Sequence, residues 1–150
     1  MARFQFRLKT LLAVREAARD ECQTKLAEMY LAQRKLETRR AELEAEISGQ
    51  QARVRADVAP GRVYVDRLLT TDRYESVLHS DVEILAKREQ ALTTEIERQR
   101  QAVAVADREV RVLEKLRGKQ FEQYLQQQSL AESKQLDEVA ARAFQHKDAS

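Results

Sequence analysis

The side chains that could carry out chemistry are few and lie far apart in the sequence. The two histidines, His79 and His146, have no second His or Cys at a spacing that suits a metal ion. The single cysteine, Cys22, has no histidine near it to act as a base, so a small apolar role suits it better than a nucleophilic one. No glycine-rich loop is present to bind phosphate. We therefore expect no catalytic residue, no cofactor and no metal site.

The many charged residues point to neither acid–base catalysis nor nucleic-acid binding. A pair of catalytic carboxylates needs a cleft that excludes water and shifts a pKa. A nucleic-acid partner would require a one-sided basic face with aromatic residues for stacking. Here 27 Lys and Arg are interspersed with 25 Asp and Glu. We expect no nucleic-acid partner.

The composition predicts long helices rather than a layered globular core. Charged residues make up 35% of the chain and aromatic residues 5%, which leaves little bulky apolar volume. Three glycines and one proline provide few places for a sharp turn. No apolar run is long enough to span a membrane, so we expect no direct membrane insertion. A lone cysteine fits a reducing compartment.

Apolar residues recur at alternating steps of three and four along two long segments, the pattern of a coiled-coil seam. The second seam runs from Leu78 to Tyr124 and is the more regular. We expect one helix over about residues 4–57 and another over about 72–146. The first seam comprises Leu26, Met29, Gln33, Leu36, Arg40, Leu43, Ile47, Gln50 and Val54.

The residues between the two segments predict a connection over about 58–71. Ala59-Pro60-Gly61 must end the first helix, because proline disfavours helix before it and glycine tolerates a turn. Thr70, Thr71 and Asp72 can cap the second helix, and residues 62–69 can form a short helical piece. A short connection requires antiparallel pairing. The sequence therefore predicts an all-α fold, a single domain over 1–150 formed by a long antiparallel two-helix coiled coil, or α-helical hairpin.

Matching polar residues with polar residues selects a register between the helices. We expect Ile47 to face Leu85 and Gln33 to face Gln99. A shift by one heptad would set Gln33 against Leu92 and Leu26 against Gln99, leaving amides without obvious partners. Arg40 and Glu89 also fall near each other in the seam. Either their aliphatic stems line the seam while their charged groups reach water, or the two side chains form an ion pair across the seam.

The N-terminal segment allows a different interpretation. Basic residues from Arg3 to Arg19 alternate there with apolar ones, as in a targeting presequence or a helix that lies on a membrane surface. Glu16 and Asp20 argue against both, and no small-residue cleavage site follows. A peripheral membrane tether stays an alternative that binding to anionic vesicles would test.

Two motifs resemble a known protein family. The opening, Phe4-Gln5-Phe6-Arg7-Leu8-Lys9-Thr10-Leu11-Leu12 with Arg15, is similar to the start of the flagellar export protein FliJ family, in which F-x-F-x-L-x-x-LL-x-x-R is common. Leu113-Glu114-Lys115-Leu116-Arg117 with Lys119, and the segment from Lys134 to Arg142, resemble the C-terminal helix of that family. The resemblance covers essentially the whole chain. Gly118 departs from it, since a helix former is expected there and a bend is conceivable.

The resemblance implies a non-enzymatic, stalk-like part of the bacterial flagellar type III export apparatus. Its partners would be the hexameric export ATPase, the cytoplasmic domain of a membrane protein of the export gate, and export chaperones that it escorts. It would be cytoplasmic and peripheral to the inner membrane through that apparatus. Tyr74 and Leu78 match a pair used toward the export gate. The residues expected at the ATPase end are Phe4, Phe6, Leu8, Leu11, Leu12, Arg15, Leu136, Asp137, Glu138 and Arg142.

Simpler alternatives remain for these residues and for the whole chain. The apolar residues at the ATPase end can equally be seam residues, and Tyr74 can simply pack over the turn. On the seam alone, the protein could be a generic coiled-coil adaptor or a secretion chaperone that binds exported subunits. Ring assembly of the ATPase would separate these functions, because only the stalk hypothesis requires an effect on it.

Overall fold

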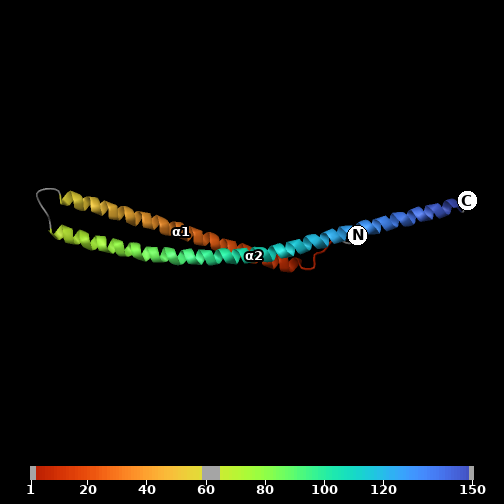
Figure 1. Cartoon of the computed structure of the whole chain (residues 1–150), viewed down its shortest axis with the longest axis horizontal. Coiled ribbons are helices and arrows are strands. Elements are labelled where there is room, and N and C mark those ends of the chain that lie inside the picture. The colour runs from red at the N-terminus through yellow and green to blue at the C-terminus, as the bar shows by residue number, and fades with distance from the viewer. Residues whose placement is uncertain (1–2, 59–64, 149–150) are drawn as a thin grey trace. The chain divides into compact units, whose positions relative to one another are not determined.

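The computed structural model describes residues 3–58 and 65–148 and consists of two long helices (Figure 1). Helix α1 runs from Lys9–Asp57 and helix α2 from Val65–Asp148, and the described ranges contain no β-strand. The helices pack against each other, which confirms the predicted all-α helical hairpin. This result follows from a composition rich in helix formers with an apolar residue every three or four positions.

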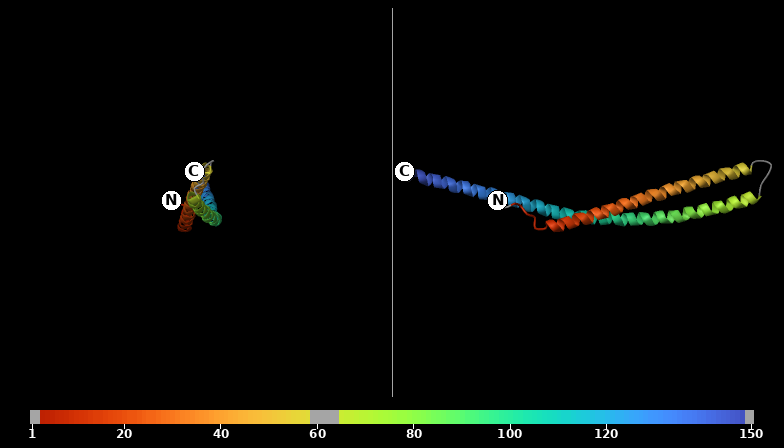
Figure 2. Two further views of the ribbon diagram at one scale, coloured as in Figure 1. Left: turned by 90° about the vertical axis from the view of Figure 1, so that its left-hand side faces the viewer. Right: turned by 180° about the vertical axis from the view of Figure 1, so that it is seen from behind.

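The described residues form two compact units. The terminal unit joins the chain up to Asp20 with the chain from Ala104 onward, and the hairpin unit spans Glu21–Val103. Within the hairpin unit, α1 and α2 lie side by side in all views (Figures 1 and 2). The single domain predicted over 1–150 stays a prediction. The predicted turn at Ala59-Pro60-Gly61 lies outside the described residues.

Helix α1 begins at Lys9, five residues later than predicted. The amide of Lys9 donates to the carbonyl oxygen of Phe6 at 3.1 Å, closing a turn just before the helix. Residues two apart point to different sides of a helix, whereas a non-helical segment is free of that constraint. The non-helical start therefore lets both Phe4 and Phe6 pack against the terminal unit's core cluster.

Helix α2 begins at Val65, earlier than the predicted start near residue 72. Thr70 and Thr71, interpreted from the sequence as caps, lie inside the helix. Their hydroxyls donate to the carbonyl oxygens of Asp66 at 2.9 Å and Arg67 at 2.7 Å, four residues back. Asp66 occupies the first turn, where a carboxylate is favourable at a helix N-terminus. The remainder of the predicted helical piece, residues 62–64, lies outside the described residues.

The register in the hairpin unit differs from the predicted one by about one heptad. Leu43 is 2% exposed and forms one buried cluster with Leu78 and Leu85. The predicted register would have placed Leu43 opposite Glu89 and Leu78 opposite Val54. The register prediction is therefore wrong, although the half-buried and buried positions follow the predicted seam.

A backbone acceptor explains why the rejected register is acceptable. The side-chain amide of Gln99 donates from Nε2 to the carbonyl oxygen of Cys22 at 3.0 Å. The Gln99 amide therefore has an acceptor although no polar side chain lies opposite it. The argument that the shifted register leaves this amide unpaired therefore fails, and the buried leucine cluster decides the pairing.

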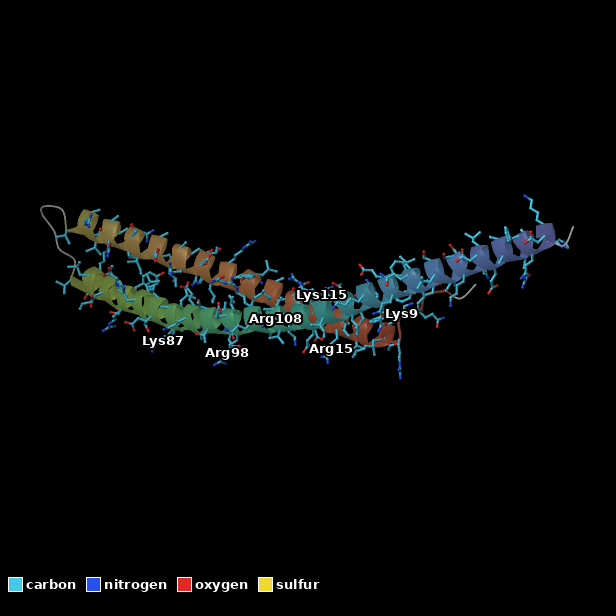
Figure 3. All side chains as sticks on the ribbon, turned by 45° about the vertical axis from the view of Figure 1, so that its right-hand side comes forward. Lys9, Arg15, Lys87, Arg98, Arg108 and Lys115 are labelled. Carbon is cyan, nitrogen blue, oxygen red and sulfur yellow. The ribbon has the colours of Figure 1, made fainter. Side chains whose placement is uncertain are left out.

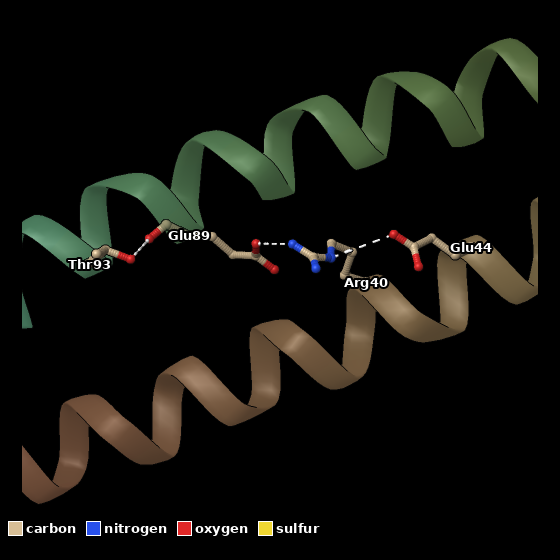
Figure 4. A network of polar contacts seen from close by, with 4 residues as sticks. All are labelled: Arg40, Glu44, Glu89 and Thr93. Carbon is tan, nitrogen blue, oxygen red and sulfur yellow. Dashed lines mark hydrogen bonds and ion pairs between the residues drawn. The ribbon is translucent and has the colours of Figure 1, made fainter.

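A charged pair crosses the seam of the hairpin unit (Figure 4). Arg40 Nη1 lies 2.7 Å from Glu89 Oε2, and Arg40 Nε lies 3.6 Å from Glu44 Oε1. The Glu89 side chain is 18% exposed, whereas that of Arg40 is 48% exposed. The ion pair, one of the two sequence interpretations, is therefore the one observed. Among the described residues, Glu89 Oε1 is buried without a hydrogen-bond partner.

The terminal unit has its own apolar core. Phe6 and Leu12 form a buried cluster with Val110 and Leu113, of which Val110 is fully buried. The ring of Phe4 lies edge-on to Phe121 at 5.2 Å between centroids. The aromatic residues thus close one end of the paired helices, beyond the aliphatic cluster.

Candidate partner-binding surfaces

The residues predicted to face the export gate have opposite exposures in the hairpin unit. Tyr74 is 44% exposed, whereas Leu78 is 3% exposed and belongs to the core cluster with Leu43. Leu78 therefore has no accessible surface for a partner while the helices are paired. The large apolar residues exposed on α2 on either side of Tyr74 are Val65, Leu69, Val77 and Ile84, and the sequence interpretation assigned none of them to a binding surface. For Val77 and Ile84, a spacing of seven residues was the available signal.

A shallow hollow adjoins Tyr74. It has a volume of about 430 Å³ and is lined by Ala45, Glu46, Gly49, Gln50, Arg53 and Tyr74. A methyl group added at Gly49 would meet no atom within 4 Å. Gly49 thus leaves open space on α1 beside an exposed aromatic ring on α2. Tyr74 and this hollow form a surface that could receive an apolar side chain, and we call it the hairpin-end surface.

The N-terminal residues predicted for the ATPase end mostly serve the core of the terminal unit. Phe6 and Leu12 are buried, and Phe4 and Leu8 pack against them. Leu11 remains exposed. Arg15 lies on the surface, with Nη1 2.9 Å from Glu109 Oε2. For the buried residues, the structure agrees with the simpler interpretation that they are seam residues.

The C-terminal residues predicted for the same end lie elsewhere on α2. Leu136 is 70% exposed, and every described residue from 125 to 148 is exposed. Leu136 follows Tyr124, the last half-buried residue, by twelve positions, which is about 18 Å along a helix. The structure therefore does not bring Leu136, Asp137, Glu138 and Arg142 into contact with the N-terminal set. We call residues 125–148 the exposed extension.

An aromatic clasp marks the start of this extension. Phe4 contacts Phe121 and also Tyr124, whose ring centroid lies 5.5 Å away. Gln128 donates from Nε2 to the hydroxyl oxygen of Tyr124 at 2.7 Å. Beyond the clasp, no described residue of α2 is buried or half-buried. Sequence interpretation missed Phe121, which lies outside the seam spacing.

The described surfaces offer apolar contacts flanked by charges. Within residues 3–58 and 65–148, no three His, Cys, Asp or Glu side chains gather as metal ligands. Cys22 is partly buried in the seam of the hairpin unit, and His79 is exposed. In the same ranges, neither helix has a stretch apolar and long enough to cross a bilayer. What the arrangement can do is bind another macromolecule.

Comparison with known proteins gives one match. The family model described as "Flagellar FliJ protein" matches residues 4–149. Searches of curated proteins and of solved structures found no match. The matched range includes the N-terminal motif, both helices, the hairpin-end surface and the whole exposed extension.

Proposed function

Because the chain belongs to the flagellar FliJ family, we propose that it is a stalk-like component that binds the hexameric export ATPase and links it to the export gate. The family is an export-associated, non-enzymatic part of the flagellar protein export machinery. Within that frame, the proposal assigns the exposed extension to the ATPase and the hairpin-end surface to the cytoplasmic domain of the gate protein. The protein would then act in the cytoplasm, at the inner membrane through its partners.

The exposed extension is the observation that carries the ATPase assignment. A helix of this kind normally buries its large apolar side chains against a neighbour. Here Leu130, Leu136, Val139 and Phe144 are each more than 60% exposed. Residues 132, 135, 136 and 139 line a surface hollow of about 360 Å³. Large apolar side chains left this exposed support binding to another protein, because apolar surface that gathers on a monomer commonly marks an interaction site.

The experiment adds the full-length protein to the purified export ATPase and measures ring formation and ATP hydrolysis. Leu136→Glu is expected to abolish the stimulation, because it places a charge in the apolar contact. Gln127→Glu introduces the same charge at an exposed polar position of the extension and should leave the stimulation intact. Equal loss in both variants, or no effect of the unaltered protein, would refute the ATPase assignment.

The hairpin-end surface supports the gate assignment through its exposed ring beside open space. Tyr74→Ala removes the ring, and Gly49→Leu fills the hollow with a side chain. Both variants are expected to weaken binding to the isolated cytoplasmic domain of the gate protein. His79→Ala, at an exposed position five residues further along α2, is the control. Unchanged binding by both variants would remove the hairpin-end surface from the proposal.

The alternative of a secretion chaperone makes a different prediction. It requires direct binding of exported flagellar subunits, which the stalk proposal does not. A pull-down with purified subunits and with the ATPase separates the two. Binding to subunits alone would favour the chaperone.

A further inference from the structure

A second apolar surface lies on the side of the terminal unit's paired helices. The large apolar side chains exposed within residues 9–20 and 104–119 are Leu11, Val14, Val105, Val112 and Leu116. None belongs to the core cluster of this unit. Val112 is the most exposed, at 65%. We call these five residues the lateral face.

Helical spacing and one ion pair place the five residues on one surface. On α2, Val105, Glu109, Val112 and Leu116 follow one another by four, three and four residues and so share a side. On α1, Val14 and Arg15 follow Leu11 by three and four residues and share a side with it. Arg15 Nη1 lies 2.9 Å from Glu109 Oε2, which joins the two sides across the helix pair.

Cations border the lateral face. Arg108 and Lys115 lie three or four residues from Val112 on α2, and neither makes an ion pair with another described residue. Figure 3 labels them with Arg15 on the same unit. A different side of α2 carries Asp107, which lies 2.9 Å from Arg111. Residues 3–20 and 104–119 together hold ten Lys and Arg but five Asp and Glu, whereas the whole chain is nearly balanced.

We propose that the lateral face is a docking surface for an amphipathic helix of a partner protein, whose apolar stripe is flanked by Asp or Glu. An apolar strip across two paired helices, bordered by cations along its α2 edge, offers a third helix apolar contact and complementary charge. From Val105 to Leu116 the strip measures about 17 Å, or three helical turns. This proposal goes beyond the stalk function and shares only Leu11 and Arg15 with the predicted ATPase-end residues.

The same features disfavour two other occupants. Binding to a membrane would push the Glu109 carboxylate and its ion pair into lipid, where charge is costly. A second copy would carry the same excess of Lys and Arg in residues 3–20 and 104–119, so it would offer Arg108 and Lys115 repulsion rather than complementary charge. An acidic helix meets neither obstacle, since its carboxylates would face those cations.

The test uses the full-length protein and two synthetic amphipathic helical peptides of identical apolar sequence. One carries Glu at the positions that flank its leucine stripe, and the other carries Lys there. In fluorescence anisotropy the Glu peptide is expected to bind and the Lys peptide is not. Equal affinity for the two peptides, or no binding of the Glu peptide, would overturn the proposal.

Matched variants tie the binding to this surface. Val112→Glu should weaken binding of the Glu peptide about tenfold or more, a loss of about 1.4 kcal/mol. Ala13→Glu adds the same charge at an exposed position of α1 that faces a different side from Leu11 and should change it little. Arg108→Glu with Lys115→Glu should transfer the preference to the Lys peptide. Circular dichroism checks that each variant keeps its helix content. Equal loss of Glu-peptide binding in Val112→Glu and in the control variant would contradict the assignment of the binding to the lateral face.

Two further measurements distinguish the other occupants. Flotation with vesicles that contain anionic lipid measures membrane binding, and light scattering over a concentration series measures self-association. Suppose that the Glu peptide binds no better than the Lys peptide. Vesicle binding that Val112→Glu abolishes would then assign the lateral face to lipid, and dimer formation that Val112→Glu abolishes would assign it to a second copy. In either case the effect of the exposed extension on the ATPase would be untouched, so failure here is distinguishable from failure of the stalk proposal.

Discussion

The hairpin unit and the terminal unit bury their apolar side chains in different ways. In the hairpin unit, aliphatic side chains around Leu43 form the core, and the Arg40–Glu89 pair interrupts the seam. In the terminal unit, a non-helical segment adds Phe4 and Phe6 to a fully buried Val110. Pairing in the first depends on the seam alone, whereas pairing in the second also depends on an aromatic clasp at its end. Substitutions should therefore act locally and differently in the two units.

The largest effect is expected from Leu43→Ala in the hairpin unit. Leu43 is 2% exposed, and truncating a buried leucine costs about 2–5 kcal/mol. Thermal and urea unfolding followed by circular dichroism measure the loss. Leu31→Ala, at a position 56% exposed, is the control and should change stability by less than about 0.5 kcal/mol. Similar losses in both variants would mean that the leucine cluster is not the core of this unit.

The helices and the seam were predictable from the sequence, whereas the register was not. Periodicity identifies seam positions such as Leu43 and Leu85, because every helical register buries the same stripe. Two registers one heptad apart bury the same apolar positions. They differ mainly in which residue of the other helix lies opposite each polar seam residue. For Gln99, the acceptor is the backbone carbonyl of Cys22, and matching side chain with side chain cannot reveal it.

The candidate sites show a similar limit. The seam pattern already placed Leu78 among the buried positions, and Leu78 is buried in the structure. The family resemblance paired Leu78 with Tyr74 as a binding site, but of these two residues only Tyr74 is accessible. That the second helix extends past the first could be predicted, because the expected helices, about 4–57 and 72–146, differ in length by about twenty residues. The residue at which pairing stops could not, because it depends on the register and on the placement of Phe4 near Tyr124.

The second prediction concerns the charged pair in the hairpin unit. Arg40→Leu leaves the mostly buried Glu89 carboxylate without its cation and should cost about 1–3 kcal/mol. Glu89→Leu removes the carboxylate, while the half-exposed Arg40 can be solvated, so stability should stay the same or rise. Urea unfolding of both variants measures this asymmetry. Equal destabilisation by the two changes would show that the pair stabilises the seam as a unit.

The third prediction concerns the aromatic clasp of the terminal unit. Phe4→Ala removes the ring contacts with Phe121 and Tyr124 and should release the N-terminal segment at a cost of about 1–2 kcal/mol. Hydrogen exchange should accelerate in residues 3–12 and in α2 near Phe121, without change around Leu43. Phe144→Ala, at a position 69% exposed, is the control and should leave exchange there unaltered. Faster exchange in the hairpin unit as well would show that the clasp supports both units.

The smallest effect, from one glycine in each unit, tests most directly whether the two units are stabilised independently. Gly118 and Gly49 both lie inside helices, and a methyl group at either would meet no atom within 4 Å. Alanine is favoured over glycine in a helix by about 1 kcal/mol, so exchange of nearby amides should slow about fivefold. If the units are independent, Gly118→Ala protects α2 amides of the terminal unit alone, and Gly49→Ala protects amides of the hairpin unit alone. Protection of both units by either change would show instead that the continuous helices couple them into one cooperative structure.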